Sequence, residues 1–165
     1  DLNKGKYLHD VIEANHNADF CIGVAGYPEK HLESPSLKSD LKRLKEKVDA
    51  GADYVVTQMF FDNQKYFDFV KSAREIGINV PIIPGIKPLA VQRHLQLLPQ
   101  VFKIDLPEPL ITEVEKCKSN TEVRQVGVEW AIQQSKELLE AGVPLLHYYS
   151  MGKSTNIKAI AEAVF

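Results

Sequence analysis

The chain has 165 residues, of which 44% are hydrophobic and 25% charged, the balance of a soluble globular domain. Its net charge of -2 argues against nucleic acid or an anionic membrane as a partner, and no apolar run approaches the roughly 20 residues of a membrane span. No export signal is recognisable, so we expect a cytoplasmic protein. Cys21 and Cys117 lie far apart without metal-ligand spacing, so we expect reduced thiols and no metal.

Apolar patterns predict strands and helices in alternation. Short β-branched, aromatic or apolar runs predict four strands, at 19–26, 54–61, 80–86 and 143–149. We expect the first of them to be buried on both faces, because its apolar run is nearly continuous. Apolar residues three or four positions apart predict helices at 36–50, 64–75, 89–98, 121–140 and 155–164.

Several residues mark where these elements begin and end. Asp62 or Asn63 is expected to cap the helix that follows the second strand, and Gly77 to end it. Between 99 and 119 the pattern is less regular, and Pro107 and Pro109 predict a turn with a short helix behind it.

Strands alternating with helices indicate right-handed βαβ units and a parallel sheet. Two architectures fit, an open doubly wound sheet or part of a (βα)₈ barrel. No GxGxxG follows the first strand, which argues against a dinucleotide-binding unit. Polar residues and glycines follow the strand ends, where a barrel keeps its chemistry: Tyr27, Gln58, Gly85 and 150–153. Four units are half a barrel, so we interpret 1–165 as a single partial domain.

The helix at 36–50 carries Asp40, Arg43 and Lys47 on one face, beside its leucine stripe. They form either an ordinary solvated edge or a charged rim at a barrel mouth. In the second case Lys47 can meet a phosphate and Asp40 a hydroxyl or ring nitrogen.

Gln58 interrupts an otherwise apolar strand, and an amide buried without partners costs about 1–3 kcal/mol. Its side chain is therefore either satisfied by core backbone or directed at a ligand, and an amide suits the edge of a pterin or flavin.

The other polar candidates are weaker. His147 lies in an apolar strand, where a core histidine is the default interpretation. Lys153 stands in a Gly-Lys-Ser turn, but the full GxxxxGK[ST] phosphate motif is absent.

Five segments carry a specific combination of motifs: AGYPE at 25–29, LKEKVDAGA at 44–52, TQMFFD at 57–62, PIIPGI at 81–86 and HYYS at 147–150. In this order and spacing they resemble the methylenetetrahydrofolate reductase family. The resemblance implies a TIM (βα)₈ barrel, of which this chain is the second half, strands 5–8. It also implies an FAD cofactor, NADH or NADPH as reductant, and reduction of 5,10-methylenetetrahydrofolate to 5-methyltetrahydrofolate.

The resemblance assigns residues to both ligands. Those at the family's flavin-contacting positions are Ala25, Tyr27, His31, Ser34, Asp40 and Lys47, with Ala25 and Ser34 the softer matches. On the folate side are Gln58, which matches a glutamine that hydrogen-bonds the pterin, then Lys153 and, on a loop that departs from the family pattern, His94.

The family's general acid lies on a Phe-Glu-Phe-type strand that has no counterpart here, so we expect it upstream of Asp1 and no catalytic residue in this chain. The isolated chain is then expected to be inactive or nearly so. Two alternatives remain open: a non-catalytic half-barrel that binds flavin or folate, and a structural homo-oligomer paired through exposed sheet edges.

Overall fold

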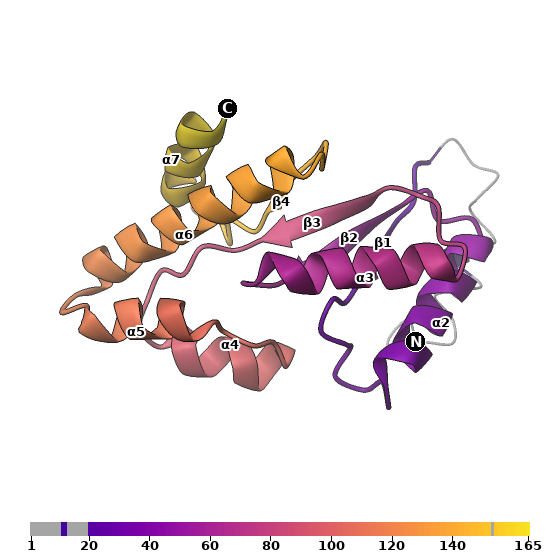
Figure 1. Ribbon diagram of the computed structural model, residues 1–165, viewed down its shortest axis with the longest axis horizontal. Helices are drawn as coiled ribbons and strands as arrows, with labels where there is room; N and C mark the ends of the chain where they lie inside the picture. The colour runs from indigo at the N-terminus through magenta and orange to yellow at the C-terminus, as the bar shows by residue number, and fades with distance from the viewer. Residues whose placement is uncertain (1–10, 13–19, 153) are drawn as a thin grey trace.

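The computed structural model describes residues 11–12, 20–152 and 154–165 of the chain, and its strands and helices alternate (Figure 1). The strands are β1 (Gly23–Gly26), β2 (Tyr54–Met59), β3 (Ile82–Ile86) and β4 (His147–Tyr148). The helices are α2 (Leu37–Asp49), α3 (Asn63–Glu75), α4 (His94–Phe102), α5 (Glu108–Lys116), α6 (Asn120–Glu140) and α7 (Thr155–Val164).

The strands form one parallel sheet in the order β1-β2-β3-β4, which is also their order along the chain. Gly26 pairs with Thr57, Val56 with Ile83, and Gly85 with His147. All four strands therefore end at the same edge of the sheet. This arrangement confirms the predicted α/β fold with a parallel sheet.

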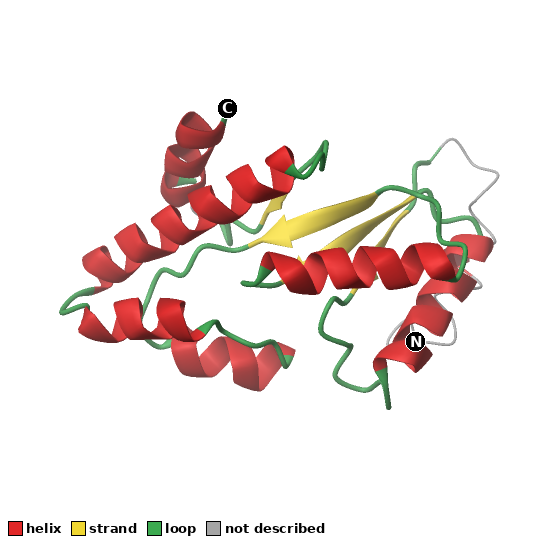
Figure 2. Ribbon diagram, in the orientation of Figure 1, coloured by secondary structure: helices red, strands yellow, loops and turns green. Residues whose placement is uncertain are grey.

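Helices pack against one face of the sheet, and Figure 2 shows them beside the strands. The main core joins Val24, Val55 and Ile82 of the strands to buried side chains of α2, α3, α6 and α7. In Figure 1, α3 runs alongside the strands, and α6 lies beside β4 near the carboxyl end of β3. A second core, which includes Met59, Leu89 and Leu110, lies beyond the strand ends among α4, α5 and the start of α6.

The opposite face of the sheet is only partly covered by the described residues. In β1, Val24 and Gly26 are buried while Gly23 and Ala25 are exposed. In β2 the same alternation leaves Val56 and Gln58 half-buried. Our expectation that the first strand is buried on both faces was therefore wrong, because the helices cover one face of it.

Side-chain caps fix the starts of several helices. The Asp62 carboxylate accepts from the Gln64 backbone N–H at 2.9 Å, which confirms its predicted role at the start of α3. Ser36 and Ser119 cap α2 and α6 in the same way through their hydroxyl groups.

Several predicted boundaries were wrong, and the first strand begins only at Gly23. The helix expected at 89–98 is α4, which begins only at His94, because 87–90 lies outside any helix or strand and buries Leu89. The short helix expected behind Pro107 and Pro109 is α5, but the two prolines lie at its beginning instead of framing a turn before it, since proline is tolerated in a first helical turn. The strand expected at 143–149 shrinks to His147–Tyr148, where it pairs with β3.

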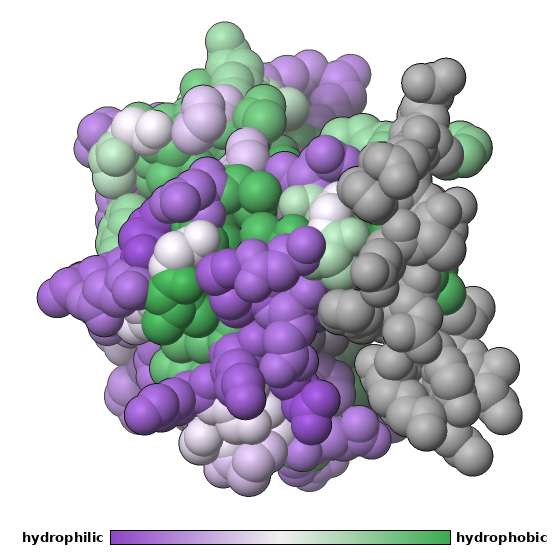
Figure 3. Space-filling view, turned by 90° about the vertical axis from the view of Figure 1, so that its right-hand side faces the viewer, coloured by the Kyte–Doolittle hydropathy of each residue, from purple (hydrophilic) through white to green (hydrophobic). Residues whose placement is uncertain are grey.

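The surface combines charged and apolar groups. Figure 3 shows the right-hand side of the view in Figure 1, where green apolar residues lie among purple polar ones. Phe20 is 71% exposed and Met151 76%. Among the residues that the structure describes, no helix has the length and apolar character to span a membrane.

Candidate functional site

The carboxyl ends of the strands bring Tyr27, Gln58 and Tyr149 to one edge of the sheet. The Tyr149 hydroxyl donates to the Thr57 carbonyl oxygen at 2.8 Å, which ties the segment after β4 to β2. Burial raises the pKa of Tyr149, and the proximity of Tyr27 raises it further. Tyr27 and Tyr149 therefore share one environment, although they follow β1 and β4.

Lys47 brings a positive charge to this region from the last turn of α2. Its ammonium group donates to the Ala25 carbonyl oxygen at 2.9 Å, across 22 residues of sequence. Burial lowers the pKa of Lys47, while the negative charge of Asp40 opposes that effect. Lys47 is thus a partly desolvated cation held against the end of β1.

Tyr27, His31 and Asp40 lie together beside that lysine. The Asp40 carboxylate accepts from the His31 backbone N–H at 3.0 Å, so the helix holds the loop that follows β1. The rings of Tyr27 and His31 meet edge to face, with their centroids 4.6 Å apart. Burial raises the pKa of the Tyr27 phenol, and the Asp40 charge adds to the rise.

The turn that carries His31 is held by Lys30, whose backbone has a positive φ of 81°. The Lys30 ammonium group donates to the carbonyl oxygens of His31 and Ser34. Ser34 is only 7% exposed, and its hydroxyl has no hydrogen-bond partner among the described residues. A buried hydroxyl group without a partner is uncommon in folded proteins.

The predicted flavin-side residues thus gather around the end of β1 and the facing side of α2. Of the three charged residues predicted on one face of α2, Asp40 and Lys47 are half-buried and engaged, while Arg43 is exposed.

Gln58 lies one strand away, on the partly uncovered face of the sheet. The register of β2 against β3 shifts between Val56 and Met59, and the Gln58 side-chain oxygen accepts from the Met59 backbone N–H at 3.0 Å. This bond fixes the amide at the strand end, and its NH₂ group provides two donors.

His94 and Lys153 have different outcomes. The Nδ1 atom of His94 accepts from the Ala90 backbone N–H at 3.2 Å, and burial lowers the pKa of its imidazole, helped by Lys87. His94 is therefore fixed beside the segment that leaves β3. Lys153 lies outside the described residues. His147, expected in the core, is exposed, and its ring meets that of Tyr149 edge to face at 4.7 Å.

Three residues of this edge were missed. Lys87 directly follows β3, and burial lowers the pKa of its ammonium group. Tyr149 shares the environment of Tyr27, and Glu29 is a largely buried carboxylate two residues further along that loop. A charged or phenolic side chain directly after a strand is the signal that finds Lys87 and Tyr149, whereas no local signal marks Glu29.

The sequence model of the family described as methylenetetrahydrofolate reductase matches residues 2–164. The chain is 37% identical over 155 residues to a probable methylenetetrahydrofolate reductase (NADPH) of Caenorhabditis elegans, covering 93% of this chain and 23% of that protein. It is 35% identical over 160 residues to the 5,10-methylenetetrahydrofolate reductase of Pectobacterium carotovorum, covering 96% of this chain and 54% of that protein. The chain therefore spans about a quarter to a half of these relatives.

A solved structure also resembles the chain. It is that of a Clostridium thermocellum protein described as binding two copies of 5-methyl-5,6,7,8-tetrahydrofolic acid. The match has a TM-score of 0.60 at 21% identity and covers 94% of this chain and 57% of that one, which supports the α/β fold. Because the family's sequence model spans nearly the whole sequence, the chain belongs to the methylenetetrahydrofolate reductase family.

Proposed function

We propose that this chain is the flavin- and folate-contacting part of an FAD-dependent 5,10-methylenetetrahydrofolate reductase that uses NADH or NADPH. The observation that carries the proposal is the cluster of Tyr27, His31, Asp40 and Lys47 at the end of β1, with Gln58 at the same edge of the sheet. Family membership supports the reductase activity, and relatives named as NADPH and NADH enzymes support the reductant.

We further propose that the four strands correspond to strands five to eight of a (βα)₈ barrel. Two features support this correspondence. The parallel strands follow one another in sequence order without the reversal that marks a doubly wound sheet. Helices α2, α3, α6 and α7 pack on one face of the sheet, as the outer ring of a barrel does, and Gly23 and Ala25 are exposed on the other.

The residues at the end of β1 fit an FAD molecule. The Lys47 ammonium group donates one hydrogen bond to the described residues. Two of its three N–H groups can therefore donate to pyrophosphate oxygens. Ser34 supplies an unused buried hydroxyl. Ala25, small and exposed, leaves room for a ligand against the strand.

FAD, when bound, supplies the hydride transfer that takes electrons from the nicotinamide and delivers them to the folate. The chain's own residues bind and orient. Lys47 offsets phosphate charge, and the Gln58 NH₂ group donates hydrogen bonds to acceptor atoms on the edge of the pterin. We propose that the proton donor for the folate lies in the part of the relatives that this chain does not cover. These 165 residues alone then do not catalyse the reaction.

The experiment is a titration of FAD into the chain, followed by quenching of flavin fluorescence. We expect saturable binding, and Lys47→Met should weaken it about 10- to 100-fold, the value of a lost charge-assisted hydrogen bond. Lys42→Met is the matched control, because Lys42 is an exposed lysine of the same helix. Equal FAD affinities for the two variants, or no binding by the unmodified chain, would contradict the proposal.

We also propose that the chain forms a homo-oligomer. Within the described part of the chain, β1 and β4 are the outermost strands and each pairs with one neighbour only. The outer side of each therefore has backbone groups free to pair with a second copy. Light scattering that finds a monomer at high concentration would contradict this.

A further inference from the structure

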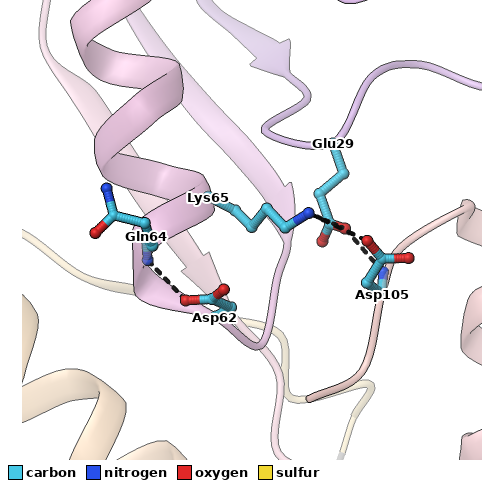
Figure 4. A network of polar contacts seen from close by, with 5 residues as sticks. All are labelled: Glu29, Asp62, Gln64, Lys65 and Asp105. Atoms are coloured by element: carbon cyan, nitrogen blue, oxygen red, sulfur yellow. Dashed lines mark hydrogen bonds and ion pairs between the residues drawn. The ribbon is translucent and has the colours of Figure 1, made fainter. Parts of the chain in front are cut away.

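Glu29 links two parts of the molecule that are distant in sequence. It follows Tyr27 by two residues, and its side chain is only 7% exposed. The Glu29 Oε2 atom accepts from the Asp105 backbone N–H at 2.8 Å, although 76 residues separate the two (Figure 4). Glu29 thus joins the loop after β1 to the segment between α4 and α5.

The negative charge of Glu29 is poorly compensated. The Lys65 ammonium group lies 3.9 Å from Glu29 Oε2 but only 3.1 Å from Asp105 Oδ2, so one lysine is shared by two carboxylates. The second oxygen, Oε1, is buried and has no hydrogen-bond partner among the described residues. A buried carboxylate in this position is costly when ionised, because it has lost water without gaining a full set of partners.

Glu29, Lys65 and Asp105 line a groove with a volume of about 350 Å³, and other charged groups face it as well. They are Lys30, Asp68 and Lys103. The first two are occupied, since Lys30 binds the carbonyl oxygens of His31 and Ser34 and Asp68 accepts from Gln64. Burial is the largest effect and, together with the Asp105 charge, raises the pKa of Glu29 to about 7, against the opposing effects of the Asp105 N–H and Lys65.

We propose that Glu29 is a positioning residue whose carboxyl group ties the loop bearing Tyr27 and His31 to the segment before α5, and that this tie closes with uptake of a proton. Its consequence for the flavin rests on the function proposed above, because Tyr27 and His31 belong to the proposed FAD site. Glu29 itself is not assigned a contact with the ligand.

The direction of the pH effect follows from linkage. When the loop opens, Glu29 enters water and its pKa returns to about 4.5, so the closed loop binds the proton more tightly than the open loop. The proton-linked stabilisation of the closed loop is complete below pH 4.5 and is lost as the pH rises through 7. Between pH 6 and pH 8 the ratio of closed to open loop should fall about tenfold.

Hydrogen exchange at the Asp105 amide measures this ratio directly. In the unmodified chain we expect its protection factor, corrected for intrinsic exchange, to fall about tenfold from pH 6 to pH 8. Glu29→Gln keeps an oxygen acceptor for the Asp105 N–H but cannot ionise, so protection should become independent of pH. The Val55 amide, which donates to the Pro81 carbonyl oxygen in the sheet, is the internal control and should show no such step.

The FAD affinity of the same proteins tests the link to the site. If the tie positions the loop for FAD, affinity should fall towards pH 8 in the unmodified chain more steeply than in Glu29→Gln. Because the two proteins differ only at Glu29, any other pH effect on FAD binding is common to both and cancels in this comparison. The proposal is overturned if Asp105 protection is equal at pH 6 and pH 8, if its pH dependence survives in Glu29→Gln, or if FAD affinity has the same pH dependence in both proteins. Absence of FAD binding at every pH, with the Asp105 step present, would refute the proposed function while leaving the tie intact.

Discussion

Gly85 shows how one residue shapes the edge of the sheet where the site lies. A Cβ atom at this position would meet the Thr57 carbonyl oxygen at 2.3 Å and the Tyr149 ring at 2.6 Å. The absence of a side chain lets the Tyr149 ring lie close to β3 while its hydroxyl reaches the Thr57 carbonyl oxygen. The Gly85 backbone N–H also donates to the Thr57 hydroxyl at 2.9 Å, so the contact cannot relax easily.

Gly85→Ala should therefore destabilise the fold by about 1–3 kcal/mol, measured as the free energy of unfolding in urea. Gly23→Ala is the matched control. Its Cβ would also approach another atom to 2.3 Å, but that atom belongs to the Tyr54 ring, which can swing aside. A similar loss in both variants would show that backbone contact at Gly85 is not the cause.

At the residue scale, the sequence predicted the side chains that meet at the end of β1. Asp40 and Lys47 stand seven positions apart, so spacing predicts that they lie on one face of α2, and the family resemblance assigns both to the same site as Tyr27 and His31. Glu29 could not be found in this way. Its burial depends on Asp105, whose position relative to β1 is set by how α4 packs, and no local pattern encodes that contact.

At the scale of elements, helix α3 begins with a cap that carries measurable stability. Asp62→Ala removes the acceptor of the Gln64 N–H and should cost about 0.5–2 kcal/mol of unfolding free energy. Asp68→Ala, on an exposed turn of the same helix, is the control and should cost less than about 0.5 kcal/mol. Equal costs would mean that capping does not stabilise α3.

Elements with strong periodic patterns were predicted well, and those that depend on packing were not. Helices α2, α3 and α6 lie close to their predicted ranges, because leucine stripes or caps define them locally. The segment at 89–98 carries a helical pattern, yet its first residues lie outside the helix. Leu89 is buried with its backbone against Gly127 of α6, a tertiary contact that overrides the local preference for helix.

At the scale of the whole molecule, the alternation of strands and helices was sufficient to predict a parallel sheet. The extent of the last strand was not predictable, since β4 has only two residues and exists through its pairing with Gly85 and Ile86. The arrangement that results brings the proposed flavin-side residues and Gln58 to one edge of the sheet.

In the proposed function, flavin and folate contacts occupy this same edge. This placement is tested most directly by titrating 5-methyltetrahydrofolate into the FAD-loaded chain while recording the flavin absorption spectrum. We predict a saturable change in the flavin bands. Gln58→Ala should lower the affinity for 5-methyltetrahydrofolate about tenfold, the value of a lost hydrogen bond, and leave the affinity for FAD unchanged. Gln64→Ala, an exposed glutamine of α3, should leave the change as it is. An unperturbed flavin spectrum at high folate concentration, or equal behaviour of the two variants, would contradict the account.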